Sequence, residues 1–176
     1  MKKYLLILPV FLTPLFLLKS CIGIPAGITP VKVDKKSYLG KWHEIARLDH
    51  SFERGLKQVT ATYTLREDGG IKVLNKGFHT EKNQWKEAEG RAYFVNQDTV
   101  GHLKVSFFGP FYGSYVIFAL DHKNYQWAYV TSHNKKYLWL LSRTPTVSKE
   151  RKLHFLDTAK RLGFKVENLI FLEPKK

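Results

Sequence analysis

The sequence predicts an all-β fold: an eight-stranded antiparallel up-and-down β-barrel with one C-terminal α-helix and a short final strand. Three observations lead to this fold class. From Gly40 onward, short segments rich in β-branched and aromatic residues alternate with turn signals. The connections are shorter than the Greek-key crossovers that a β-sandwich needs. One segment of helical periodicity follows the last strand pattern.

Each expected strand has the period of two of a half-buried sheet. Between residues 58 and 66, apolar side chains alternate with threonines, and Asp68-Gly69-Gly70 then turns the chain. The connection Asp49–Lys57 is longer and more polar than the others, which suits a lid over a barrel mouth. The strands are expected at residues 41–49, 58–67, 71–79, 85–95, 102–108, 114–121, 126–132 and 137–143.

The helix is expected to begin after Ser148, whose hydroxyl is a suitable N-cap, and to stop at Gly163. Trp127 and Tyr129 take the outward parity of the seventh strand, so we expect them to pack under this helix. A final strand is expected at residues 166–172.

The first 20 residues have the features of an export signal. Lys2 and Lys3 form a basic start, and the apolar segment after them is too short and too interrupted by prolines to be a good membrane span. The sequence Leu18-Lys19-Ser20-Cys21 resembles the bacterial lipobox, in which the cysteine becomes an acylated N-terminus, although Lys19 stands where a small residue is usual. An ordinary signal peptide, with Cys21 unmodified, is the alternative.

We therefore expect a lipoprotein signal peptide at residues 1–20, a lipidated linker at 21–36 and the barrel domain at 37–176. Two glycines and two prolines interrupt the linker, which would reach about 60 Å at most when extended. The residue after the cysteine is Ile22 and not Asp, and this resembles lipoproteins that are sent to the outer membrane. The expected location is the outer membrane, with the domain facing the periplasm.

The composition excludes several function classes. The chain carries 29 Lys and Arg against 15 Asp and Glu, a net charge of +14. These basic residues are spread along the chain and alternate with apolar residues, which is typical of a solvated sheet face rather than of a nucleic-acid site. Weak attraction to anionic lipid headgroups stays open. Because Cys21 is the one cysteine, the domain has no disulfide of its own and no thiol nucleophile.

Strand direction brings three motifs to one end of the barrel. Gly40-Lys41-Trp42 starts the first strand, the turn from Asp121 to Tyr125 joins the sixth and seventh, and Arg143 ends the eighth. This combination resembles the lipocalin family, and the resemblance covers nearly the whole chain. It implies that Arg143 packs across the Trp42 ring at the closed end, a cation–π contact of about 1–2 kcal/mol. It also implies a fatty acid or lysophospholipid as the ligand.

The inward face follows from the period of two once Trp42 and Arg143 point inward. It mixes small and large apolar groups with two tyrosine hydroxyls, which suits a long aliphatic ligand with a polar head near the mouth. A filled barrel without a cavity is the alternative. Glu44 shares this parity and would be a buried carboxylate, with Arg143 or Arg47 as candidate partners. The expected ligand-binding residues are Ala46, Ala61, Tyr63, Val73, Ala92, Val105, Phe107, Tyr115, Ile117, Val130, Trp139 and Leu141.

Neither catalysis nor a cofactor or metal site is expected. The seven histidines are scattered without zinc-ligand spacing on a helix, and the chain has no nucleophile-elbow or phosphate-loop motif. The expected partners are the lipid ligand and the membrane that holds Cys21. A different hypothesis is a structural lipoprotein whose residues around Phe111 and Tyr112 bind a partner protein or form a homodimer. An enzyme acting on lipids is the weaker alternative.

Overall fold

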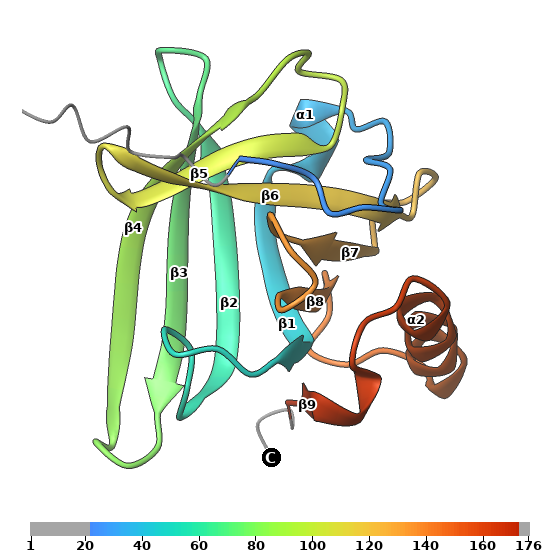
Figure 1. Ribbon diagram of the computed structural model, residues 1–176. Helices are drawn as coiled ribbons and strands as arrows, with labels where there is room; N and C mark the ends of the chain where they lie inside the picture. Colours follow the sequence, from blue (N-terminus) through green and yellow to red (C-terminus); the bar gives the residue numbers. More distant parts are fainter. Residues whose placement is uncertain (1–21, 173–176) are drawn as a thin grey trace, which may run out of the picture.

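Nine antiparallel strands form one curled sheet in the computed structural model, which describes residues 22–172 (Figure 1). The expected signal peptide, Cys21 and residues 173–176 lie outside the described residues. The helices are α1 (Lys35–Tyr38) and α2 (Lys149–Arg161), and η1 (Val166–Asn168) is a 3-10 turn. The strands are β1 (Gly40–Leu48), β2 (Leu56–Leu65), β3 (Ile71–His79), β4 (Gln84–Phe94), β5 (His102–Phe108), β6 (Phe111–Leu120), β7 (Trp127–Thr131), β8 (Leu138–Ser142) and β9 (Leu169–Phe171).

Consecutive strands pair from β2 to β8, and β8 pairs with β1. The first part of β1 also pairs with β2, with Gly40 opposite Tyr63 and His43 opposite Thr60, and this pairing closes the barrel. The strand β9 extends the sheet beside the last part of β1. The eight-stranded up-and-down barrel predicted from the sequence is therefore confirmed.

The strand β1 changes neighbours along its length. Its register against β8 shifts between Glu44 and Ala46. Up to His43 it pairs with β2, and from Ala46 onward it pairs with β9 instead. An extra residue of this kind bends a strand and changes the face that the following side chains occupy. Side chains after Glu44 therefore no longer follow the alternation that Trp42 sets.

The segment expected to be a free linker is attached to the barrel. Val31 N donates to Ile117 O at 2.9 Å, and Val31 O accepts from Gly101 N at 2.8 Å. Val33 N donates to Thr99 O at 2.9 Å, and the Val33 side chain is buried in the barrel interior. The expected free reach of about 60 Å is therefore wrong, because this segment buries apolar side chains and pairs its backbone with the barrel.

Three further elements differ from the sequence prediction. The turn of helix α1 was not expected, and it forms because the Asp34 carboxylate accepts a hydrogen bond from Ser37 N at 2.7 Å. The strand β6 begins at Phe111 rather than at residue 114, since Phe111 pairs with Phe108 across the hairpin. The expected final strand is shorter, because Val166–Asn168 forms the turn η1 before β9.

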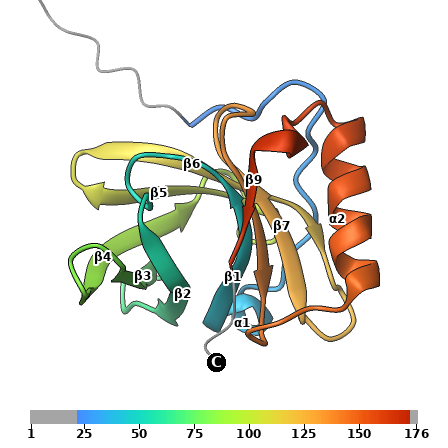
Figure 2. The ribbon, with the colours of Figure 1, turned by 90° about the horizontal axis from the view of Figure 1, so that it is seen from below.

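Helix α2 packs on the outside of the barrel, beside β7 (Figure 2). Ser148 caps it by accepting from Arg151 N at 3.2 Å, and Gly163 follows its end with a φ of +79°. The Tyr129 ring lies 4.9 Å from the Phe155 ring, which places Tyr129 under the helix as predicted. The Arg151 guanidinium covers Trp127 at 3.7 Å. Within residues 22–172, neither helix is long and apolar enough to cross a membrane.

Candidate functional site

Arg143 closes one end of the barrel by contacts with separate segments of the chain. Its guanidinium carbon lies 3.8 Å from the centre of the Trp42 ring, a cation–π distance. Gly40 has a φ of +93°, and a Cβ at this position would lie 3.2 Å from Arg143 Nη1. The guanidinium donates, at 2.8 to 3.2 Å, to the backbone oxygens of Ser37, Leu39, Lys41 and Tyr125.

Asp121 holds the turn between β6 and β7. Its carboxylate accepts hydrogen bonds, at 3.2 to 3.3 Å, from the backbone N–H groups of Lys123, Asn124 and Gln126. This turn presents the Tyr125 carbonyl to Arg143 and the Tyr125 hydroxyl to Asp34 N, which donates to it at 2.8 Å. The three sequence motifs therefore meet at one end of the barrel.

The half of the barrel next to this closed end is filled by aromatic side chains. The Tyr115 hydroxyl lies 2.8 Å from that of Tyr38 and 2.9 Å from that of Tyr63. Burial raises the pKa of Tyr63 to about 12 and raises the pKa values of Tyr38 and Tyr115 well above their ordinary values. The three phenols are therefore neutral, and each can donate and accept within the trio.

Eleven of the twelve expected ligand-binding side chains belong to the interior cluster. Tyr63, Val73, Ala92, Ile117, Val130 and Leu141 are buried, while Ala61, Val105, Phe107, Tyr115 and Trp139 are half-buried against them. For Ala46 the predicted orientation is wrong. The register shift in β1 places Ala46 opposite Leu140, and both are buried in the outer core under α2. Arg47 instead takes the position opposite Trp139.

The half of the barrel toward the open end is accessible. The unbroken register of β3 and β4 places Ala88 and Gly90 on the same inward face as the buried Ala92. Ala88 is nevertheless exposed, and Gly90 is half-buried, as are Val105 and Phe107 on the adjacent strand β5. Ala88 lies on the part of β4 that extends beyond its pairing with β5, which begins at Arg91, so its side chain is uncovered there. This pattern is compatible with an interior that is accessible toward the open end.

Buried charged groups gather at the open end, where Arg47 lies at their centre. Arg47 Nη1 donates to Glu44 Oε1 at 2.6 Å, and each of these side chains is 3% exposed. Arg47 is thus the partner of Glu44, and Arg143 is not. Arg47 Nη2 donates to the backbone oxygens of Glu53 and Leu56 at 2.9 and 3.2 Å, so the guanidinium fastens the β1–β2 connection onto the barrel.

The β1–β2 connection covers part of the mouth with a buried carboxylate. The Glu53 side chain is 10% exposed, and its Oε2 accepts a hydrogen bond from Trp139 Nε1 at 3.1 Å. The His50 ring nitrogen Nε2 lies 3.0 Å from the same oxygen, and the Phe52 ring stacks on His50 at 3.9 Å. Alternation along strands does not identify Glu53 and His50, because both lie in a loop that folds back onto the barrel.

The two buried carboxyl groups have pKa values shifted in opposite directions. Burial, reinforced by the negative charge of Glu53, raises the pKa of Glu44 well above its ordinary value. Burial also opposes the ionisation of Glu53, but the contacts from His50 and Trp139 outweigh it and hold the pKa of Glu53 below its ordinary value. Among the described residues, Arg47 Nε has no hydrogen-bond partner. Glu44 is therefore the weaker acid of the two, and one buried guanidinium N–H is left unsatisfied.

Comparison with known proteins agrees with this geometry. Residues 33–174 match the family model described as a lipocalin-like domain. The chain belongs to the lipocalin family. This lipocalin is 58% identical over 158 residues to the outer membrane lipoprotein Blc of Vibrio cholerae, a match that covers 89% of the chain and 92% of that protein. It is 51% identical over 164 residues to the outer membrane lipoprotein Blc of Escherichia coli, with 92% of each covered.

A solved structure with the same fold is insecticyanin from the tobacco hornworm Manduca sexta. Its TM-score is 0.69 at 21% sequence identity, and the match covers 88% of each chain. This likeness shows that the strand arrangement is that of lipocalin barrels.

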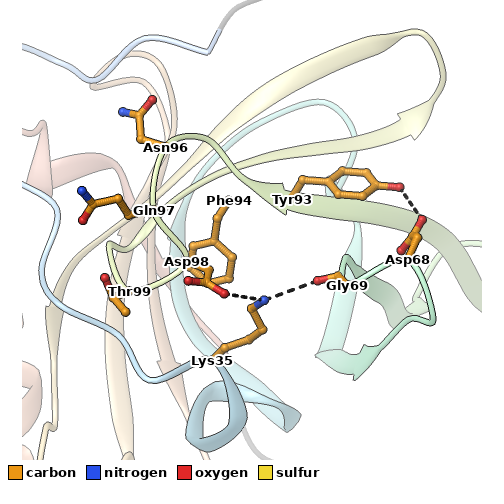
Figure 3. A pocket seen from close by; sticks show the side chains of 9 residues that line it. All are labelled: Lys35, Asp68, Gly69, Tyr93, Phe94, Asn96, Gln97, Asp98 and Thr99. Atoms are coloured by element: carbon orange, nitrogen blue, oxygen red, sulfur yellow. Dashed lines mark hydrogen bonds and ion pairs between the residues drawn. The ribbon is translucent and has the colours of Figure 1, made fainter.

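Two surface hollows lie outside the barrel interior of this lipocalin. The larger, about 550 Å³, lies between α1 and the β2–β3 and β4–β5 connections (Figure 3). There Lys35 Nζ lies 3.0 Å from Asp98 Oδ2, and Tyr93 donates to Asp68 Oδ2 at 3.0 Å, so these groups already satisfy one another. The smaller, about 230 Å³, lies beside Glu44, where β1 leaves β2. Within the described chain, no cluster of three His, Cys, Asp or Glu residues suits a metal ion.

Proposed function

We propose that this lipocalin holds a fatty acid or lysophospholipid in the open half of its barrel and stores or transports it. The observation that carries the proposal is the accessible inward face around Ala88, Val105 and Phe107, beside a filled and closed opposite end. A single acyl chain suits an apolar interior that is closed at one end and open at the other. Its polar head would remain at the open end, near Arg47 and Trp139.

The location of the protein is part of this proposal. Two relatives that match over about nine-tenths of the chain are named outer membrane lipoproteins. Cys21 follows Leu18-Lys19-Ser20 and would carry the acyl chains, with the barrel on the periplasmic side of the outer membrane. A lipid carrier in this place would serve the maintenance of the membrane under stress. Family membership and the names of the relatives favour a binding protein over an enzyme.

Native mass spectrometry tests the ligand. The full-length mature protein is incubated with palmitate or with palmitoyl lysophosphatidylethanolamine, and the bound mass is measured against lipid concentration. We expect a complex of one lipid per barrel, and lipid extraction of the purified protein identifies the ligand acquired in the cell. A protein that carries no lipid and takes up neither compound would contradict the proposal.

A pair of tryptophan variants locates the binding site. Ala88→Trp adds a large ring to an exposed, inward-facing position and should weaken lipid binding at least about tenfold. Glu89→Trp is the matched control, because Glu89 faces outward and pairs with Lys72 at 2.8 Å. Equal lipid affinities for the two variants would mean that the ligand lies elsewhere.

A further inference from the structure

Two phenylalanines project from the tip of the β5–β6 hairpin. Phe108 is 82% exposed and Phe111 is 59% exposed, and the two face each other across the hairpin. Gly109 and Pro110 between them are also exposed. The barrel has interior positions for aromatic side chains, as Phe107 shows, so the exposure of this neighbouring pair indicates a surface that contacts something apolar.

The base of this tip is positively charged. The Arg91 guanidinium lies against Gly109, with Nη2 2.7 Å from the place of a Cβ on that glycine. Arg91 and Lys104 also lie over the Tyr112 ring, at 5.9 and 5.2 Å from its centre. No acidic residue occurs in the sequence from residue 99 to residue 120. In a bilayer with anionic lipids, the negative headgroups lie outside the apolar acyl chains. The hairpin has the complementary order, with apolar rings at its tip and cationic side chains at its base.

The start of the described chain lies on the same hairpin. The Ile22 carbonyl is 3.0 Å from His102 Nε2, and that ring nitrogen is also 3.0 Å from Ser114 Oγ. Ser114 is three residues from Phe111 along β6, a distance of about 10 Å in a strand. Cys21 is the residue directly before Ile22 in the sequence. An acyl group on Cys21 would therefore leave the barrel beside the hairpin and not at the end of a long tether.

We propose that the tip of the β5–β6 hairpin inserts into the phospholipid membrane that holds the lipid anchor, as a second attachment point. Phe108 and Phe111 enter the apolar boundary of the bilayer, and Arg91 and Lys104 contact anionic headgroups. The β5–β6 and β1–β2 connections lie at the same end of an up-and-down barrel, so this attachment brings the open end toward the membrane. The proposal depends on the acylation of Cys21 proposed above and is independent of which lipid the barrel holds.

Site-specific fluorescence tests this arrangement in the mature, acylated protein. Cys21 is the one cysteine and is blocked by acylation, so Phe108→Cys supplies a single reactive thiol for a nitrobenzoxadiazole label. The protein is reconstituted in vesicles of phosphatidylethanolamine and phosphatidylglycerol with and without nitroxide-labelled lipid. Leu153→Cys is the matched control, because Leu153 is 55% exposed on the opposite element α2. We expect blue-shifted emission and strong nitroxide quenching at position 108, and water-like emission at position 153.

Three other outcomes would overturn the proposal. Equal, water-like emission at both positions would show that the tip stays in solution. Protection of the label at position 108 that depends on protein concentration and not on vesicles would show a second copy of the chain as the occupant. An intact mass with unmodified Cys21 would remove the premise, while lipid uptake by the barrel would be unaffected. The double change Arg91→Glu and Lys104→Glu should reduce quenching in vesicles with phosphatidylglycerol and leave it unchanged in vesicles of phosphatidylcholine.

Discussion

Replacement of Arg143 by alanine tests how the closed end is held together. The change removes the stack on Trp42 and four hydrogen bonds to backbone oxygens. The bonds to Ser37 and Lys41 are exposed, so water replaces them at little cost, whereas those to Leu39 and Tyr125 are partly buried. With about 1 kcal/mol for each partly buried bond and about 1 for the stack, the free energy of unfolding should fall by about 3 kcal/mol.

A second arginine separates the stack from the hydrogen bonds. The Arg151 guanidinium lies 3.7 Å from the Trp127 ring and donates to the Tyr129 hydroxyl at 3.3 Å, but it bonds to no set of backbone oxygens comparable to that of Arg143. Arg151→Ala should therefore lower the free energy of unfolding by about 1 kcal/mol. Arg143→Lys keeps the charge and loses the planar fork, so its effect should approach that of Arg143→Ala.

Urea unfolding followed by tryptophan fluorescence and circular dichroism measures these differences. A loss of about 3 kcal/mol corresponds to a fall in Tm of about 10 °C for a domain of this size. Equal losses for Arg143→Ala and Arg151→Ala would refute the reasoning, because the backbone bonds would then contribute nothing. A fully stable Arg143→Lys variant would show that charge alone, without the fork geometry, closes the barrel.

Three other predictions follow from the interior. Ala46→Leu should lower the free energy of unfolding by about 1–3 kcal/mol through overpacking under α2 and leave lipid affinity unchanged in the mass assay; weaker binding would return Ala46 to the inner face. In an alkaline spectrophotometric titration, four of the nine tyrosines should ionise above pH 10 or only on unfolding. Burial raises the pKa of Tyr63 to about 12 and also raises the pKa values of Tyr38, Tyr115 and Tyr129, so full ionisation near pH 10 would contradict their burial. The raised pKa of Glu44 contributes stability that is complete below the pKa of this group in the unfolded chain and is lost as pH rises through its pKa in the folded protein. Glu44→Gln removes this titration, so the urea midpoint of the variant should fall less steeply with rising pH than that of the original protein. Equal slopes for the two proteins would show that Glu44 titrates normally.

Strand alternation and turn chemistry carry most of the information about this fold. Between residues 58 and 66 the alternation of apolar and hydroxyl side chains defines both a strand and its buried face, and Asp68-Gly69-Gly70 defines its end. The sequence of the N-terminal segment does not indicate its attachment, because Gly23, Pro25 and Pro30 have the composition of a linker. Its attachment comes from backbone pairing with Gly101 and Ile117, which lie far away in the sequence.

The candidate site is predictable from the sequence as far as the alternation holds. Most inward positions on β2 to β8 follow from a period of two. On β6 the register shifts between Ile117 and Ala119, so that Leu120 lies in the interior and Ala119 packs outside. The register shift after Glu44 interrupts the period of two within β1. No residue type in this part of the sequence indicates the shift. Ala46 is small enough for either face, so strand parity is the one sequence signal for its orientation, and the register shift reverses that parity. Ala88, by contrast, could be found by extending the inward face of β4 from Ala92.

The two ends of the barrel use polar groups in different ways. At the closed end, the guanidinium of Arg143 meets four carbonyl oxygens, and the tyrosine trio satisfies its own hydroxyls. At the open end, Arg47 and Glu44 are buried with an unsatisfied N–H, although a buried ion pair adds little stability over apolar side chains. Stability alone therefore does not account for this pair. Arg47 also donates to the carbonyls of Glu53 and Leu56, and so fixes the β1–β2 connection over the open end of the barrel. The double change Glu44→Gln and Arg47→Met leaves no buried carboxylate without its partner, so it should change the rate of lipid exchange more than the free energy of unfolding.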